Sequence, residues 1–317
     1  MKGAEMSVDE FVSELSAHAE ATGRPALRPI IGELARPTRV RTVGRPGVGR
    51  RTLTAALCQA GLTVVDCRPD VEVLVIAEAA KPEDCRAMEV ADGPIVIALN
   101  KADLLGAALS GRIVAIRRVT GVPVIPVSAL LATAALDDAL VAALRLLATD
   151  PADLGSTDAF CAAPHVLDTA TRARLLAVAD LSGIAEAIAG IRAGADGREL
   201  SGLLHRLGNI DEVLAGIRAA DAPLRYRRLC ASMTRLRALA VRTGDQQLDA
   251  LLIGGTAVRA AMAAAAEVVG ADGLEAGPDD PLRRAVRWQR YSRGPVNALH
   301  RRCGADIARG ALRSGAW

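Results

Sequence analysis

The chain has 317 residues, of which 51% are hydrophobic and only 2% aromatic, and its formal net charge is +3. This length and apolar content suffice for two domains with cores of Ala, Leu, Val and Ile. The small net charge gives no reason to expect a polyanion partner for the whole chain. Six scattered cysteines without a C-x-x-C pair argue against a zinc site or a disulfide framework.

The first 37 residues predict an N-terminal helical segment. Ser7-Val-Asp-Glu10 is a capping-box pattern that predicts a helix to about Ala21. Residues 25–35 predict a second short helix, which Pro37 ends. The N-terminus MKGAEMSVDEF lacks the apolar core of a signal peptide, so we expect a cytoplasmic protein with reduced thiols.

Short apolar runs alternate with helical stretches between residues 38 and 149. Strands are predicted over 39–43, 62–65, 71–77, 95–99 and 122–127, and helices over 50–60, 82–91, 102–110 and 134–148. This alternation is typical of the α/β class, with a doubly wound parallel sheet.

The remainder of the chain predicts helices alone. Residues 150–164 are polar and irregular and are expected to form a linker. Helices are predicted over 168–194, 223–242, 246–269, 279–292 and 295–313, and two amphipathic helices meet at Gly208-Asn209. We therefore expect an all-α domain over 165–317. Its most apolar stretch, 250–269, contains Arg259 and Glu267, which favours a buried helix over a membrane span.

Residues 40–53, VRTVGRPGVGRRTL, have the outline of a phosphate-binding loop between a predicted strand and a predicted helix. Such a loop directs backbone N–H groups and a helix N-terminus at anionic oxygens, and its glycines allow close backbone approach. The pattern G-x-x-x-x-G-K-[ST] has Lys and Ser or Thr where this chain has Arg50 and Arg51.

Two further motifs follow predicted strands, at the edge where open α/β sheets bind ligands. One is N-K-x-D, formed by Asn100, Lys101 and Asp103, and the other is Ser128-Ala129-Leu130. Only three of the 39 basic residues are lysines, so a lysine at position 101 is rarely expected by chance.

In order and spacing, the three motifs resemble the translation-factor-related class of P-loop GTPases. The loop is closest to the G-R-P-N-V-G-K-S-T-L sequence of Era- and Der-like GTPases, and the resemblance covers residues 38–148. It implies a P-loop G domain that binds GTP or GDP. The phosphate-binding residues it implies are Gly44, Gly47, Gly49, Arg50, Arg51 and Thr52. The guanine-binding residues it implies are Asn100, Lys101, Asp103, Ser128 and Ala129.

The residues that support hydrolysis depart from this family. Its D-x-x-G motif corresponds to Asp66, the candidate Mg²⁺ ligand, and to Pro69, which has no N–H for the γ-phosphate. A guanidinium at Arg51 cannot ligate a cation. We therefore expect little Mg²⁺ dependence and slow or absent GTP hydrolysis, with no catalytic residue assigned.

Arg283–Arg313 holds nine arginines and one acid, with Trp288 and Tyr291 between the arginines. This segment is typical either of a surface for nucleic acid, acidic membrane or acidic protein, or of a solvated helix face with Trp288 in the core.

Three functions remain open. The chain is a guanine-nucleotide-binding regulator or adaptor that uses 165–317 for a protein partner, or a nucleotide-free scaffold (a pseudo-GTPase). The third alternative is a GTPase that binds RNA or a membrane surface through Arg283–Arg302.

Overall fold

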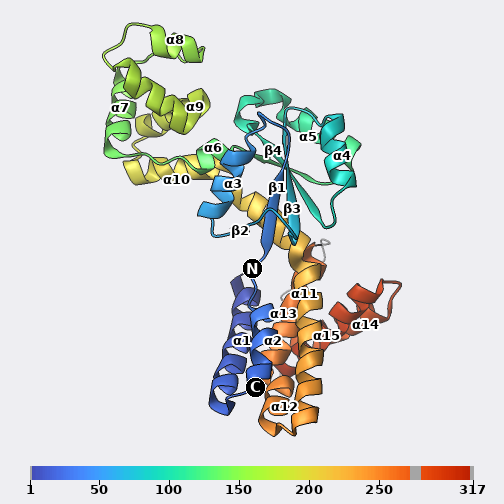
Figure 1. Cartoon of the computed structure of the whole chain (residues 1–317). Coiled ribbons are helices and arrows are strands. Elements are labelled where there is room, and N and C mark those ends of the chain that lie inside the picture. Colours follow the sequence, from blue (N-terminus) through green and yellow to red (C-terminus); the bar gives the residue numbers. More distant parts are fainter. Residues whose placement is uncertain (1, 272–279, 315–317) are drawn as a thin grey trace. The chain divides into compact units, whose positions relative to one another are not determined.

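A computed structural model describes residues 2–271 and 280–314, and the chain divides into two compact units (Figure 1). One unit is Thr38–Ile217, and the other combines Met1–Pro37 with Arg218–Trp317. The division at 37/38 coincides with the expected boundary. The expected helical domain over 165–317 is instead shared between the two units, because helix α11 (Ile210–Thr243) begins in one and ends in the other.

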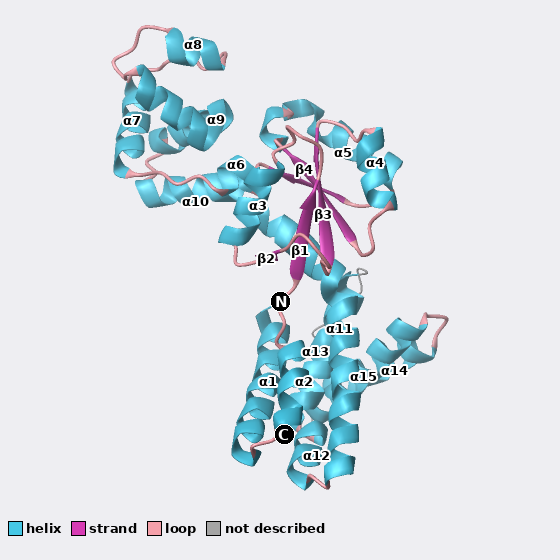
Figure 2. Cartoon of the chain, viewed as in Figure 1, coloured by secondary structure: helices cyan, strands magenta, loops and turns pink. Residues whose placement is uncertain are grey.

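The described strands of the Thr38–Ile217 unit form one five-stranded, all-parallel sheet in the order β2-β1-β3-β4-β5 (Figure 2). They are β1 (Arg39–Val43), β2 (Thr63–Val64), β3 (Val71–Ala77), β4 (Ile95–Asn100) and β5 (Val124–Val127). β1 pairs with β2 on one side and with β3 on the other, so the strand order reverses at β1. A crevice at such a reversal, outside the carboxyl ends of the strands, is the usual ligand site of an open parallel sheet.

Helices cover both faces of this sheet. Leu74, Ile76, Ile97 and Leu99 face α4 (Pro82–Glu89) and α5 (Leu109–Thr120). On the opposite face, Thr42 of β1 hydrogen-bonds Thr54 of α3 (Arg50–Gln59). Gly216 of α11 lies against Ile125 and Val96 on that face. The predicted α/β class with a parallel sheet is confirmed.

One helix of this unit was predicted at the wrong place. Residues 102–110 form the short 3₁₀ turns η2 (Ala102–Leu104) and η3 (Gly106–Ala108), and the α-helix begins only at Leu109. Gly106, with φ +46°, and Gly121, with φ +70°, bound the segment that contains α5. Glycine at positive φ is a frequent helix end, which explains the C-terminal boundary.

Five helices lie between β5 and α11, and we call them the inserted helices. They are α6 (Ala129–Ala132), α7 (Asp138–Thr149), α8 (Thr157–Ala162), α9 (Thr169–Arg192) and α10 (Gly197–Gly208). Their shared core includes Leu144, Phe160, Leu175, Ile184 and Leu204.

The predicted linker over 150–164 is part of these inserted helices, so that prediction was wrong. Phe160 is fully buried in their core, and buried Arg172 donates hydrogen bonds to the carbonyls of Phe160 and Ala163. The burial of Phe160 and the capping of α8 by Arg172 keep this segment in the folded unit, although its composition is typical of a loop.

Helix α9 is interrupted at Asp180, whose φ of 54° and ψ of 177° lie near a region that is commonly reached only by glycine. The Asp180 carboxylate accepts the N–H of the next residue, Leu181, at 2.7 Å, where the second helical segment begins. α9 therefore consists of two helical segments, and Ser182 lies in the first turn of the second.

The described part of the helical unit contains seven elements in addition to most of α11. They are α1 (Lys2–Thr22), η1 (Pro25–Leu27), α2 (Arg28–Leu34), α12 (Gln246–Ile253), α13 (Gly255–Ala271), α14 (Pro281–Arg293) and α15 (Ala298–Ser314). α1 begins before the predicted Ser7, and the predicted helix over 246–269 is broken at Gly254. The predicted start at 279 lies outside the described residues.

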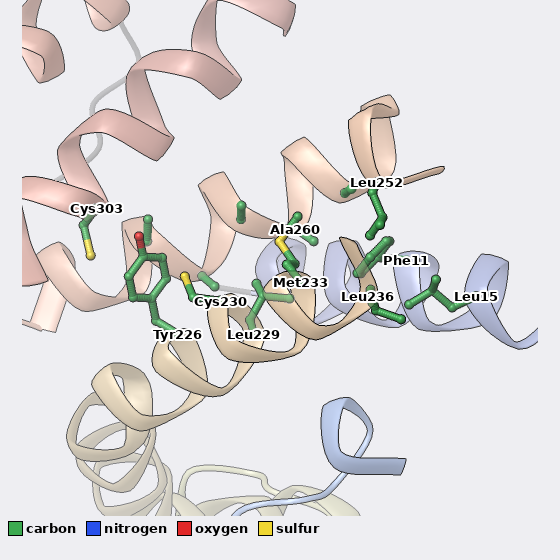
Figure 3. Packing of buried hydrophobic residues seen from close by; sticks show 14 of the residues in the cluster. Phe11, Leu15, Tyr226, Leu229, Cys230, Met233, Leu236, Leu252, Ala260 and Cys303 are labelled. Carbon is green, nitrogen blue, oxygen red and sulfur yellow. The ribbon is translucent and has the colours of Figure 1, made fainter. Parts of the chain in front are cut away.

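The core of the helical unit joins the two ends of the chain (Figure 3). Phe11 and Leu15 of α1 are buried in one cluster with Leu236 of α11. In the same core the Tyr226 hydroxyl donates to Asp306 at 2.7 Å, beside Cys230 and Cys303. Burial raises the pKa of the Cys303 thiol to about 12 and also raises that of Cys230, so both remain protonated and unreactive.

Asp245 connects α1 to the start of α12. Its carboxylate accepts the Leu248 N–H and lies 2.9 Å from His18 and 3.3 Å from Arg24. Burial alone would raise the pKa of Asp245, but the Leu248 N–H, His18 and Arg24 lower it. Its contribution to stability is therefore present above the ordinary carboxyl pKa and is lost as the pH falls through the lowered value.

No single described helix is long and apolar enough to cross a membrane. The only pair that passes such a test together among the described residues is α12 with α13, which bend by 43° at their junction.

Candidate functional site

The loop between β1 and α3 has the backbone shape that its glycines predict. Gly44, Gly47 and Gly49 have φ values of +151°, +85° and +84°. A Cβ at Gly44 would lie 2.6 Å from the carbonyl oxygen of Val75. The loop therefore needs glycine at position 44 for space and at 47 and 49 for conformation.

A row of backbone donors follows from this shape. Among the described residues, the N–H groups of Gly47 and of 49–52 have no protein acceptor, and the first intrahelical bond of α3 runs from Leu53 to Gly49 at 3.0 Å. Unsatisfied N–H groups and the positive end of the helix dipole together favour an anion at this point.

Asn100 links this loop to the other two motifs. Its Nδ2 donates to the Val48 carbonyl at 2.9 Å, and its Oδ1 accepts the Ala129 N–H at 3.0 Å. The side chain is only 3% exposed, and a Cβ at Gly49 would lie 2.2 Å from its Nδ2. The carboxyl ends of β1, β4 and β5 are thus joined by one buried amide.

The other guanine-motif residues have different environments. Lys101 is exposed with φ of 60°, and Ser128 is buried with its N–H donating to the Gly208 carbonyl at 3.1 Å. The Ala129 N–H, expected to meet a guanine carbonyl, is already bonded to Asn100. Asp103 accepts the Ser182 hydroxyl of α9 at 2.7 Å.

Three arginines lie in or after the loop. Arg50 and Arg51 are exposed, and within residues 2–271 and 280–314 their side chains form no hydrogen bond or ion pair. Arg45 instead donates to both oxygens of buried Asp84, at 3.0 and 3.1 Å. Asp84 also accepts the Lys81 N–H at the start of α4. Of these three arginines, Arg50 and Arg51 therefore remain available to a ligand.

A metal site has little support in the described side chains. Asp66 is exposed in the bend after β2, and Thr52 is half-buried in the first turn of α3. Across the described ranges, no three His, Cys, Asp or Glu side chains gather closely enough to hold a metal ion.

A cavity of about 340 Å³ lies beside Asp103, between the sheet edge and the inserted helices. Its walls are Ala102, Asp103, Leu109, Pro126, Val127, Leu131, Ser182, Glu186, Leu207 and Asn209. The sequence did not indicate Ser182 or Glu186, because they lie about 80 residues after Asp103. The only sequence signal was an acid four residues after a serine, on one face of a predicted helix.

The basic C-terminal segment has an exposed face and a buried face. Arg283, Arg290 and Arg293 of α14 and Arg301 and Arg302 of α15 are exposed. Trp288 is 2% exposed and packs edge-on against Tyr291, with ring centroids 5.1 Å apart. The tryptophan is thus a core residue.

No protein-family model matches the chain, and no curated protein matches it significantly.

Proposed function

We propose that the Thr38–Ile217 unit binds a guanine nucleotide, with the diphosphate at residues 44–52 and the base beside Asp103. The free N–H groups at Gly47 and at 49–52 are the observation that carries the proposal. These donors belong to a glycine loop at the reversal of a parallel sheet, where anionic ligands are usually bound.

The two free arginines suit a diphosphate held without a metal. Each exposed guanidinium has five N–H donors for phosphate oxygens and a permanent positive charge. Arg51 stands where a hydroxyl would otherwise ligate Mg²⁺. The charge of Arg51 therefore replaces part of the charge that the ion would supply.

Slow or absent hydrolysis follows from the same residues. Fast phosphoryl transfer needs stabilisation of the β–γ oxygens and a positioned water. Pro69 has no N–H for the γ-phosphate, and exposed Asp66 belongs to no group of three or more His, Cys, Asp or Glu side chains in the described residues that could hold a cation. The unit is therefore proposed as a nucleotide-dependent regulator or adaptor with a protein partner for its helices.

A nucleotide-free scaffold is the second candidate function. The bonds from Ser182 to Asp103 and from Ala129 to Asn100 favour it, because both base-recognition groups already have protein partners. In that function Asp103 serves only to attach α9 to the sheet.

Isothermal titration calorimetry separates the two functions. We expect GDP and GTP to bind with similar affinity, little changed by Mg²⁺ or EDTA, and ATP to bind much more weakly. Asp103→Asn should shift the preference from GDP to xanthosine diphosphate, since a charge-assisted pair of hydrogen bonds is worth about 1.5–3 kcal/mol. Absence of binding by all nucleotides would favour the scaffold, and equal binding of ATP and GTP would contradict guanine recognition.

A further inference from the structure

We propose that helix α9 completes the base-binding site. Ser182 positions the Asp103 carboxylate, and Glu186 provides a second acceptor for the N–H groups of a guanine base. The inference rests on the proposed nucleotide binding and names residues that the guanine motif does not contain.

The three side chains share one cavity. Ser182 Oγ lies 2.7 Å from Asp103 Oδ2, and both residues line the cavity with Glu186. Ser182 and Glu186 are four residues apart in the second segment of α9, so they lie on the same helix face. The remaining walls are mainly apolar, as is usual for a site that holds a planar base.

The Ser182 hydrogen bond leaves Asp103 able to bind a base. A carboxylate has two oxygens and about four lone-pair sites, of which the Ser182 hydroxyl uses one on Oδ2. Oδ1 and the second lone pair of Oδ2 can still accept two N–H groups. The bond therefore fixes the Asp103 carboxylate without closing the site. Ser182 thus positions Asp103 and does not compete with the base for it.

Two carboxylates favour a base that presents donors. Ionised carboxylates only accept hydrogen bonds. The guanine edge offers N1–H and a 2-amino group with two hydrogens, so Asp103 can accept N1–H and one amino hydrogen while Glu186 accepts the other. Hypoxanthine lacks the amino group and leaves Glu186 without a partner.

The backbone of α9 brings Ser182 to this place. The interruption at Asp180 starts a new helical segment two residues before Ser182. At Gly183, a Cβ would lie 2.5 Å from Leu131, so glycine permits the close approach of α9 to α6. The inserted helices are thus seated tightly against the motif that follows β5.

The test compares GDP and inosine diphosphate binding to the full-length chain by calorimetry. The variants are Ser182→Ala, Ser182→Thr and Glu186→Ala. Matched controls are Ser201→Ala, whose hydroxyl bonds only the Gly197 carbonyl of α10, and Glu89→Ala at the exposed end of α4.

We expect Glu186→Ala to lower the affinity for GDP by roughly tenfold, since one hydrogen bond from the guanine amino group to a charged acceptor is lost. The affinity for inosine diphosphate should hardly change, because hypoxanthine has no amino group. Ser182→Ala should weaken both nucleotides by about fivefold or more through the loosened Asp103, and Ser182→Thr should restore binding. Both controls should match the wild type.

Each other outcome has a defined meaning. If the wild type binds GDP and both Ser182→Ala and Glu186→Ala bind it with the same affinity, this inference is overturned and the proposed function stands. Tighter GDP binding by Ser182→Ala also overturns it, because Ser182 would then compete with the base. Wild-type protein that binds neither nucleotide overturns the proposed function and this inference with it.

Discussion

At the scale of single residues, Asn100 determines how the candidate site is held together. Its amide pairs two buried backbone groups from different loops, and a buried group left unpaired costs about 1–3 kcal/mol. The same amide excludes any side chain at position 49. The site therefore has a rigid centre at Asn100 and Gly49, and an accessible rim at Arg50 and Arg51.

Gly47 and Gly49 form a matched pair for testing this centre. Both have φ near +85°, but a Cβ at 47 would meet nothing within 4 Å, whereas one at 49 would meet Asn100. Gly47→Ala should lower the free energy of unfolding by about 1–2 kcal/mol through backbone strain. Gly49→Ala should cost at least about 1 kcal/mol more because it also displaces the Asn100 amide.

Urea unfolding measured by circular dichroism provides the comparison. Amide exchange at Ala129 adds a local readout, since this N–H should lose protection only in Gly49→Ala. If both variants lose the same free energy of unfolding, the Asn100 side chain can move away from position 49 without a measurable cost.

The sequence identified the motif residues but not their partners. Gly44, Gly49 and Asn100 could be singled out from the sequence because they belong to short motifs whose geometry depends on the neighbouring backbone. The Asp103–Ser182 bond joins positions 79 residues apart and depends on how α9 packs. No local pattern encodes such a contact.

At the scale of elements, the interruption of α9 is the feature with the clearest energetic test. Asp180 has a backbone conformation that costs about 1–3 kcal/mol in a residue other than glycine. Asp180→Gly should therefore change the free energy of unfolding by less than about 1 kcal/mol, since relief of strain offsets the lost hydrogen bond to Leu181 and the added chain entropy. Asp180→Ala should lower it by about 1–2 kcal/mol because the hydrogen bond from Leu181 is lost and the strain remains.

Ala177→Gly is the control for this pair. Ala177 is exposed in the regular part of α9, where glycine should cost about 1 kcal/mol. The expected order of stability places Asp180→Gly above Ala177→Gly. The reverse order would show that the interruption at Asp180 is not strained.

For α14 we expect purely electrostatic binding of any polyanion, because buried Trp288 cannot stack on bases. Arg283→Glu with Arg290→Glu should weaken binding of single-stranded RNA and reduce the slope of log K against log salt by about 0.7 for each lost phosphate contact. Filter binding across a salt series measures both. Arg112→Glu with Arg145→Glu provides a charge-matched control, and equal losses in both pairs would leave α14 as a solvated face.

Elements were predictable where periodicity and turn residues agreed. β1 and β3 were predicted with their observed bounds, and α3 differs from its prediction by one residue. α5 was misplaced because Gly106 lies inside an otherwise helical composition. The segment 150–164 was misjudged because burial of Phe160, a tertiary effect, outweighs its local polarity.

At the scale of the whole molecule, the Thr38–Ile217 unit should fold without the rest of the chain. It contains both the sheet core and the core of the inserted helices. A fragment of residues 38–217 should give a dispersed amide NMR spectrum and a cooperative thermal transition. A fragment of residues 218–317 should do so only when a peptide of residues 1–37 is added, because Phe11 and Leu15 fill its core.

An unfolded 38–217 fragment, or a folded 218–317 fragment without the peptide, would contradict this division. The sequence could not predict it, because α1 packs against α13, more than two hundred residues later. Amphipathic patterns show that α1 needs a partner but not which helix supplies it.

The separation of Met1–Pro37 from Arg218–Trp317 along the chain also delays their packing during synthesis on the ribosome. At about 5–20 residues per second, translation of the ~180 intervening residues takes roughly 10–40 s. Throughout that delay the nascent α1 presents Phe11 and Leu15 to solvent, while the sheet behind it can already be completed. A chaperone that holds amphipathic helices is thus expected to protect α1, which is made before the sheet but can pack into its own core only after the sheet has been made.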